Sequence, residues 1–116
     1  MHEISVINSL LKAVLDVAKK NDCQKIVAIH LKVGELSDLQ DEWMQRYLDM
    51  LSKDTIAQGA KLKIQRVPAR MKCTVCSHEF GAVLSDLDGL VCPKCGEKKM
   101  NLISGREYFI ENMEVV

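Results

Sequence analysis

A chain of 116 residues is long enough for one folded domain, or for one domain that carries a small insert. Its sixteen basic and sixteen acidic residues cancel, so no net charge draws the protein toward nucleic acid or an anionic membrane. One Trp, two Tyr and two Phe are too few for a base-stacking surface. No run is apolar enough to cross a membrane and no basic leader precedes the first apolar stretch, so we expect a cytoplasmic protein.

The first predicted element is an amphipathic helix over residues 4–20. Its apolar residues recur three and four positions apart, at Ile4, Ile7, Leu10, Leu11, Val14, Leu15, Val17 and Ala18. Lys19 and Lys20 suit the carboxyl end of a helix, where cations meet the negative end of the dipole. Asn21 tolerates the left-handed conformation that ends many helices, so we expect the helix to end there.

A strand and a second helix follow. Residues 25–34 alternate apolar and polar side chains, which predicts a half-buried strand, and Gly34 ends it. Residues 37–53 predict a helix, with Ser37 and Gln40 at the spacing of a capping box. The expected buried face of this helix consists of Leu39, Trp43, Met44, Tyr47, Leu48 and Leu51.

Two further strands complete the predicted fold, one over residues 61–67 and one within 106–116. The crossover between the first two strands should make them parallel, and the last strand should pair antiparallel after a cysteine-rich insert. We therefore predict an α+β fold, with two helices packed on a mixed three-stranded sheet. The predicted domains are 1–70 plus 102–116, and an inserted zinc-binding domain at 71–101.

The insert holds two cysteine pairs, "CTVC" and "CPKC", separated by fifteen residues. This spacing matches the C-x2-C-x15–20-C-x2-C zinc pattern, because each two-residue gap lets a tight turn aim two thiolates at one ion. Four thiolates close a tetrahedral shell and leave no position for water, so we predict a structural zinc site at Cys73, Cys76, Cys92 and Cys95. Gly96 supports it, since glycine permits a positive φ after the turn. The alternative is two pairs of free or redox cysteines.

The other polar residues and Cys23 indicate no further metal or catalytic site. His78 is expected to support the zinc cysteines rather than to bind zinc, and His30 to face solvent or form a hydrogen bond. Cys23 is expected to be a small packing residue, with a labile thiol as the alternative. Bases and acids balance across residues 71–100, which argues against a phosphate-binding surface: Lys72, Lys94, Lys98 and Lys99 against Glu79, Asp86, Asp88 and Glu97. No catalytic constellation is visible in the sequence, so an enzyme is not predicted.

The chain begins Met1-His2-Glu3. A free amine and the first backbone amide form a five-membered chelate ring, and the His2 amide and its own Nδ1 can close a six-membered ring. Ni(II) and Cu(II) favour such planar nitrogen sets, whereas Zn(II) has no such preference. From this chemistry alone the triplet is either a metal site or an ordinary frayed terminus.

The whole chain resembles the HypA/HybF family of nickel-insertion accessory proteins. The resemblance rests on "MHEISV", "VGELS", "GAKLKIQRVPARMKC" and the two cysteine pairs. It implies a nickel metallochaperone for maturation of [NiFe] hydrogenase, and in some organisms of urease. It further implies Ni(II) at Met1, His2 and Glu3, zinc at the four cysteines, and as partners a HypB-type GTPase, the hydrogenase large subunit and urease maturation proteins.

One departure from the family pattern concerns the zinc site. In some relatives a histidine follows each cysteine pair, but here only the first pair is followed by one, His78, while Gly96 and Glu97 follow the second. The rival hypothesis is a zinc-ribbon module for protein interaction or nucleic-acid binding, in which the terminus binds no nickel.

Overall fold

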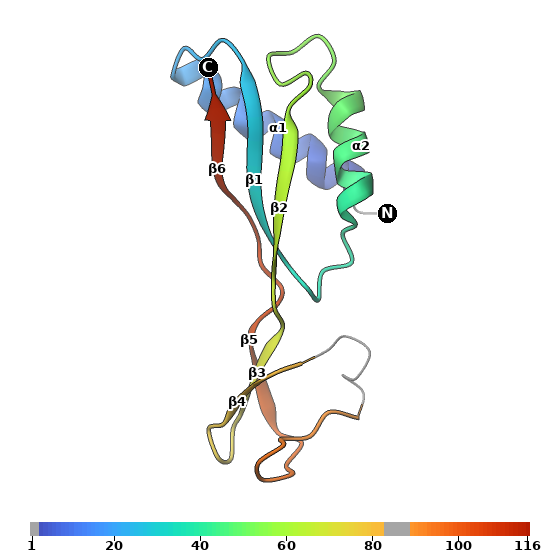
Figure 1. The fold of residues 1–116 in the computed structure, drawn as a ribbon, viewed down its shortest axis with the longest axis vertical. Coiled ribbons are helices and arrows are strands. Elements are labelled where there is room, and N and C mark those ends of the chain that lie inside the picture. Colours follow the sequence, from blue (N-terminus) through green and yellow to red (C-terminus); the bar gives the residue numbers. More distant parts are fainter. Residues whose placement is uncertain (1–2, 83–88) are drawn as a thin grey trace. The chain divides into compact units, whose positions relative to one another are not determined.

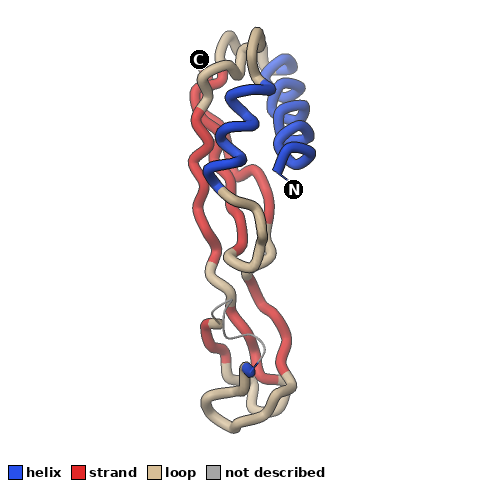
Figure 2. The backbone as a smooth tube through the Cα atoms, turned by 90° about the vertical axis from the view of Figure 1, so that its right-hand side faces the viewer, coloured by secondary structure: helices blue, strands red, loops and turns tan. Residues whose placement is uncertain are grey.

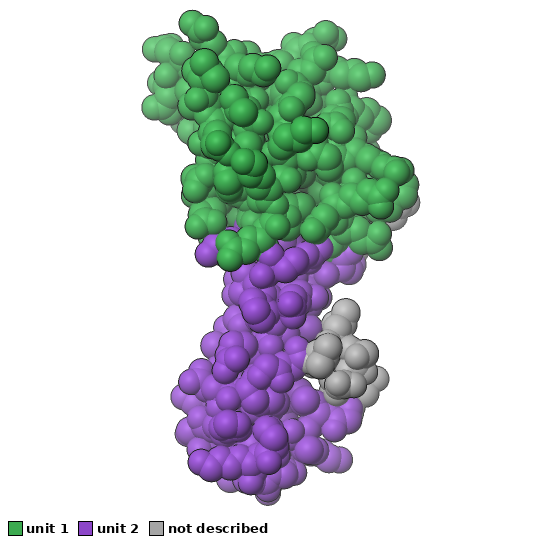
Figure 3. Space-filling model, viewed as in Figure 1, with its two compact units in different colours: residues 1–31, 39–65, 109–116 green, residues 32–38, 66–108 purple. Residues whose placement is uncertain are grey.

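The computed structural model describes residues 3–82 and 89–116, which belong to two compact units (Figure 3). The first unit takes in residues 1–31, 39–65 and 109–116, and the second takes in 32–38 and 66–108. The first unit contains both described helices, and the second contains the two cysteine pairs.

Helices α1 (Glu3–Lys20) and α2 (Asp41–Leu51) lie together on one face of a sheet (Figure 2). The buried positions of α1 span an arc of about 100° on a helix with 3.6 residues per turn. They are Glu3, Ile7, Leu10, Leu11, Val14 and Ala18. Ile4 and Val17 fall outside this arc and are 43% and 47% exposed, so the predicted apolar face was too wide.

Helix α2 buries Met44 and Leu48, and Leu39 is buried just before it, as predicted. Trp43 was expected inside but is 43% exposed, because it lies one position away from the buried row. Its ring stacks on Tyr47, with 5.9 Å between centroids, and the Arg46 guanidinium lies 5.1 Å above it. The indole therefore belongs to the outer surface of α2.

The carboxyl end of α1 is closed by two backbone hydrogen bonds. The amide of Cys23 donates to the Ala18 carbonyl at 3.0 Å and that of Asp22 donates to Lys19 at 3.3 Å, the pattern of a Schellman motif. Asp22 holds the left-handed conformation, with φ 54°, so the prediction for Asn21 was wrong by one residue. The Asn21 side chain instead donates to the Val17 carbonyl at 2.8 Å.

The start of α2 also differs from the prediction. Gln40 is the N-cap residue, with extended φ −105° and ψ 127°, and no side chain makes the expected cap hydrogen bond. The predicted capping box of Ser37 and Gln40 is therefore wrong. The N–H of Gln40 donates to the carboxylate of Glu3 at 3.2 Å, a contact across 37 positions of sequence.

The sheet beneath the helices has the order β2-β1-β6, with bounds Lys61–Val67, Ile26–Gly34 and Tyr108–Val115. The colours of Figure 1 show β1 and β2 running in the same direction and β6 running in the opposite one, so the sheet is mixed, as predicted. The central strand β1 supplies the apolar layer with Ile26, Ala28, Ile29, Leu31 and Val33. The predicted α+β fold is thus confirmed.

A polar cluster joins the three strands. One carboxylate oxygen of Glu114 accepts hydrogen bonds from His30 Nε2 at 2.8 Å and from Lys63 Nζ at 3.1 Å. These bonds, first that from His30 and then that from Lys63, lower the pKa of Glu114. His30 is hydrogen-bonded, as expected from the sequence.

The second unit contains a separate antiparallel sheet with the order β4-β3-β5. Its strands are short: β3 is Arg70–Cys73, β4 is Glu79–Gly81 and β5 is Met100–Ser104. Met71 pairs with Phe80 on one side and Cys73 pairs with Met100 on the other. The sequence did not reveal these strands, because they carry too few alternating apolar residues to give a period.

Gly34 and Gly105 pass each other without room for a side chain. The Leu36 amide donates to the Gly105 carbonyl at 2.8 Å, and the Gly34 amide donates to Glu107 at 2.7 Å. A Cβ atom built on Gly34 would overlap the carbonyl group of Gly105. Here two backbone segments are in direct contact.

We predict that Gly34→Ala lowers the free energy of unfolding by about 3 kcal/mol, because the backbone must shift to admit the methyl group. Gly81→Ala is the matched control, since its nearest neighbour would be 4.0 Å away, and it should cost less than about 1 kcal/mol. Chemical denaturation of both variants measures the difference. Equal losses in the two variants would contradict the close crossing.

Candidate metal centre

The two cysteine pairs are built on the same backbone pattern. In each turn, the amide two residues after the first cysteine donates to the sulfur of that cysteine at 3.4 Å: Val75 to Cys73, and Lys94 to Cys92. Such N–H groups favour the thiolate form that a metal ion requires.

The backbone around each turn repeats as well. The carbonyl of Cys73 accepts from the amide of Ser77 at 3.0 Å, and that of Cys92 accepts from Gly96 at 2.8 Å. The amide of the first cysteine in each pair then donates to the residue five positions later, His78 or Glu97, at 2.9 Å. Two unrelated short sequences therefore form equivalent turns.

Each turn ends in a left-handed residue. Gly96 has φ 77°, as the sequence predicted, and Ser77 has φ 65° at the equivalent position of the first turn. Ser77 was not predicted to be left-handed, although superposing "CTVCS" on "CPKCG" aligns it with the glycine. A non-glycine residue in this conformation costs about 1–2 kcal/mol.

The four sulfur atoms come together at one point. The ligand atoms of Cys73, Cys76, Cys92 and Cys95 all lie within 4.8 Å of one another. Cys73 and Cys95 sulfurs are 3.5 Å apart, and so are those of Cys76 and Cys92. Zinc–sulfur bonds of about 2.3 Å in a tetrahedron put neighbouring sulfurs about 3.8 Å apart. The residues therefore fit a tetrahedral metal ion.

The cysteines differ in their tendency to ionise. The N–H of Cys76 acts most strongly on Cys73 and lowers its pKa. Burial opposes ionisation of Cys92, but the N–H groups of Cys95 and Lys94 prevail and hold its pKa at about 6. The N–H of Glu97 favours the Cys95 thiolate, yet burial and the three neighbouring sulfurs raise its pKa to about 12. Four thiolates thus need a cation to coexist.

Those of the remaining candidate residues that the structure describes are not part of this cluster. His78 stacks on Phe80, with 5.9 Å between ring centroids, and its backbone carbonyl receives the Cys73 amide. Cys23 is half-buried in the first unit. Met1 and His2 lie outside the described residues, as do Asp86 and Asp88. Glu3 is described and is only 8% exposed.

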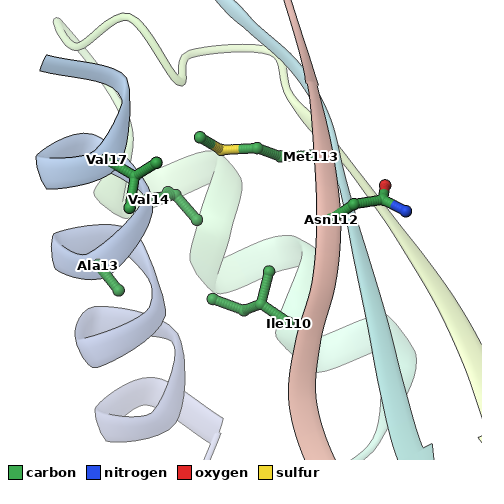
Figure 4. Close-up of a pocket in the computed structure, with 6 residues that line it drawn as sticks. All are labelled: Ala13, Val14, Val17, Ile110, Asn112 and Met113. Atoms are coloured by element: carbon green, nitrogen blue, oxygen red, sulfur yellow. The ribbon is translucent and has the colours of Figure 1, made fainter. Parts of the chain in front are cut away.

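A groove of about 250 Å³ lies between α1 and β6. Figure 4 shows the side chains of Val14, Val17, Ile110 and Met113 turned toward it, whereas Asn112 points away. These aliphatic and thioether groups offer no carboxylate, imidazole or thiolate, so the groove is not a second centre of the same kind. Among residues 3–82 and 89–116, no helix has the length and hydropathy needed to cross a membrane.

The fold and the cysteine cluster together define a small α+β protein with a four-cysteine metal site. Residues 1–115 match the model of the family described as "Hydrogenase/urease nickel incorporation, metallochaperone, hypA". The chain belongs to this family, which is one of metallochaperones, in agreement with the prediction that the protein is not an enzyme.

Individual relatives support the assignment. The chain is 39% identical over 115 residues to hydrogenase maturation factor HypA of Dehalococcoides mccartyi, covering 99% of this chain and 94% of the relative. It is 31% identical over 119 residues to that of Methanothermobacter thermautotrophicus, covering 99% and 97%. The chain is also similar to the solution structure of the Ni metallochaperone HypA from Helicobacter pylori, with 29% sequence identity and a TM-score of 0.66. The match covers 100% of this chain and 98% of the Helicobacter pylori chain.

Substitutions at the two left-handed positions, Ser77 and Gly96, should change the unfolding free energy in opposite directions. Ser77→Gly should raise the unfolding free energy of the metal-loaded protein by about 1 kcal/mol, because glycine adopts the observed φ without the Cβ penalty. Gly96→Ala should lower it by a similar amount, about 1 kcal/mol. Ser77→Ala is the matched control and should change little. Thermal unfolding checks all three, and destabilisation by Ser77→Gly would contradict the equivalence of the turns.

Metal affinity at the cluster should rise with pH. Well above pH 6 the Cys92 thiol is mostly ionised, because its pKa is about 6, but Cys95, with a pKa of about 12, must still lose its proton when a metal binds. We expect the zinc affinity to increase about tenfold per pH unit for each displaced proton between pH 6 and pH 8. Competition with a chromogenic chelator measures the zinc affinity at each pH. A pH-independent affinity, or full zinc stoichiometry in Cys92→Ala, would overturn the assignment.

Proposed function

We propose that this protein captures Ni(II) at Met1, His2 and Glu3 and delivers it during maturation of [NiFe] hydrogenase, and of urease where that enzyme is present. The observation that carries the proposal is the family match, which begins at residue 1 and so includes the amino-terminal triplet. The metal chemistry of an amine, two amides and an imidazole agrees with this role.

Capture by backbone nitrogens is compatible with the start of α1. The i→i−4 ladder of a helix does not use the amides of its first residues. Glu3 is the first residue of α1, so the helix can persist when nickel takes the amide of Glu3. A planar site at a chain terminus also favours release, because a receiving site can replace its ligands one at a time.

The cysteine cluster has a structural role in the proposed function. It holds a structural Zn(II) through Cys73, Cys76, Cys92 and Cys95, and the metal supplies folding energy to a segment with little apolar core. His78 supports the site next to the first turn. The proposed domains are a nickel-binding domain at 1–70 plus 102–116 and a zinc-binding domain at 71–101.

The proposed partners follow from the pathway of the family. They are a HypB-type GTPase, the large subunit of [NiFe] hydrogenase and, for the second recipient, urease maturation proteins, all in the cytoplasm. The names of the relatives, hydrogenase maturation factors, support the hydrogenase branch. Neither nucleic acid nor a membrane is part of the proposal.

The nickel site is tested by titrating Ni(II) into zinc-loaded, untagged protein. His2→Ala should weaken nickel binding at least about a hundredfold, because it removes the imidazole from the chelate. One extra residue before Met1 keeps every side chain but moves the amine, and it should weaken binding to a similar extent. His30→Ala is the matched histidine control and should leave binding unchanged. Undiminished binding in both altered proteins would remove the proposed site.

A further inference from the structure

Four side chains form a continuous stripe on the outer surface of α2. Trp43, Arg46, Tyr47 and Met50 lie three and four positions apart, so they share one side of the helix. Trp43 is 43% exposed, Met50 is 49% exposed and the Arg46 side chain is 60% exposed. Single exposed apolar residues are ordinary on a protein surface, whereas contiguous ones mark sites of interaction. These four residues are called the outer stripe below.

The anchoring of α2 keeps the outer stripe turned away from the core. Met44 and Leu48 are fully buried and fix the inner side of the helix. Beside them, the Gln45 side chain bonds to the backbone at the start of β2. It donates to the Ala60 carbonyl at 3.2 Å and accepts from the Leu62 amide at 2.8 Å. These contacts fix the rotation of α2 about its axis, so the outer stripe faces solvent.

The outer stripe is ordered before any partner binds. The Trp43 and Tyr47 rings stack with 5.9 Å between centroids, and the Arg46 guanidinium lies 5.1 Å from the centre of the indole. Glu42 holds this guanidinium through a 2.7 Å hydrogen bond. A partner therefore meets side chains already held in one arrangement, which lowers the conformational entropy lost on binding. Tryptophan, tyrosine and arginine are also the residues that contribute most of the binding energy at protein interfaces.

The charge around the outer stripe indicates the sign of the partner. Helix α2 carries three acidic residues, Asp41, Glu42 and Asp49, and one basic residue, Arg46, hence a net charge of −2. The chain as a whole is neutral, so this negative charge is local. A second copy of α2 would bring like charges together, whereas a basic partner would be attracted and oriented by the acidic residues.

We propose that the outer stripe is the docking surface for a basic amphipathic helix of a partner protein. Aliphatic side chains of that helix pack on the aromatic rings and on Met50, while its lysine or arginine residues face Glu42 and Asp49. A helix fits better than an extended segment, because Gln45 already occupies backbone groups at the start of β2 that an added strand would need. The surface uses none of the residues proposed to bind nickel or zinc.

The experiment uses full-length, zinc-loaded protein and two synthetic helical peptides. One peptide carries leucine on one side and lysine on the other, and the second carries glutamate in place of every lysine. Met50→Ala shortens the outer stripe, and Asp49→Lys reverses a flanking charge with a residue that suits the carboxyl end of a helix.

Val17→Ala is the matched control, because Val17 is 47% exposed on α1 and lies outside the outer stripe. Isothermal titration calorimetry gives the affinity of each peptide for each protein. The NMR resonance of the Trp43 indole N–H shows whether the peptide binds at the outer stripe.

The lysine peptide should bind the wild-type protein and shift the Trp43 indole resonance. Met50→Ala should weaken binding about fivefold, because an apolar contact within the interface is lost. Asp49→Lys should weaken it about tenfold, because a repulsive charge replaces an attractive one. Val17→Ala should stay within about twofold of the wild type, since it lies outside the interface. The glutamate peptide should bind at least about tenfold more weakly than the lysine peptide.

Four results would overturn the inference. Equal binding of the two peptides would exclude recognition by charge, and no binding of the lysine peptide up to about 1 mM would exclude the docking surface itself. Unchanged binding in both Met50→Ala and Asp49→Lys, or its loss in Val17→Ala, would place the peptide elsewhere. A wild-type dimer in sedimentation equilibrium that dissociates in Met50→Ala would make a second copy of this chain the occupant.

Discussion

Convergence of four sulfur atoms on one point is the constraint on which the second unit depends. Its buried apolar residues, among those described, are few and mostly small: Val33, Ala69, Cys73, Ala82 and Cys92. Such a set cannot form an ordinary core, so the cysteine cluster takes its place. The β3–β4 hairpin and the turn before β5 bring the two cysteine pairs together. Equivalent backbone hydrogen bonds in the two turns orient both thiolates of each pair toward one ion.

The first unit depends on ordinary apolar packing, and this explains why the sequence predicted it well. A period of three to four residues located α1, alternation located β1, and chain order fixed the mixed sheet. Cysteine spacing likewise located the metal centre, because its ligands lie in short local motifs. Local sequence patterns were therefore sufficient to predict both the main layers of the fold and the cysteine cluster.

Features that depend on contacts between distant residues were missed. Local spacing suggested that Ser37 and Gln40 cap α2, whereas the acceptor is Glu3, 37 positions away. The left-handed residue after α1 is Asp22 and not Asn21, although both residue types tolerate this conformation. The strands β3, β4 and β5 exist because each pairs with another, and three to five residues are too few to show a period.

The outward placement of Trp43 gives the protein an optical reporter of the first turn of α2. Trp43 is the single tryptophan of the chain and lies in the first turn of α2, three residues after Gln40. Its indole stacks on Tyr47 beneath the Arg46 guanidinium, so its emission depends on how that turn is ordered. The Glu3 carboxylate meets the same region at the Gln40 N–H, so loosening of this contact between α1 and α2 can be followed with a fluorophore that needs no label.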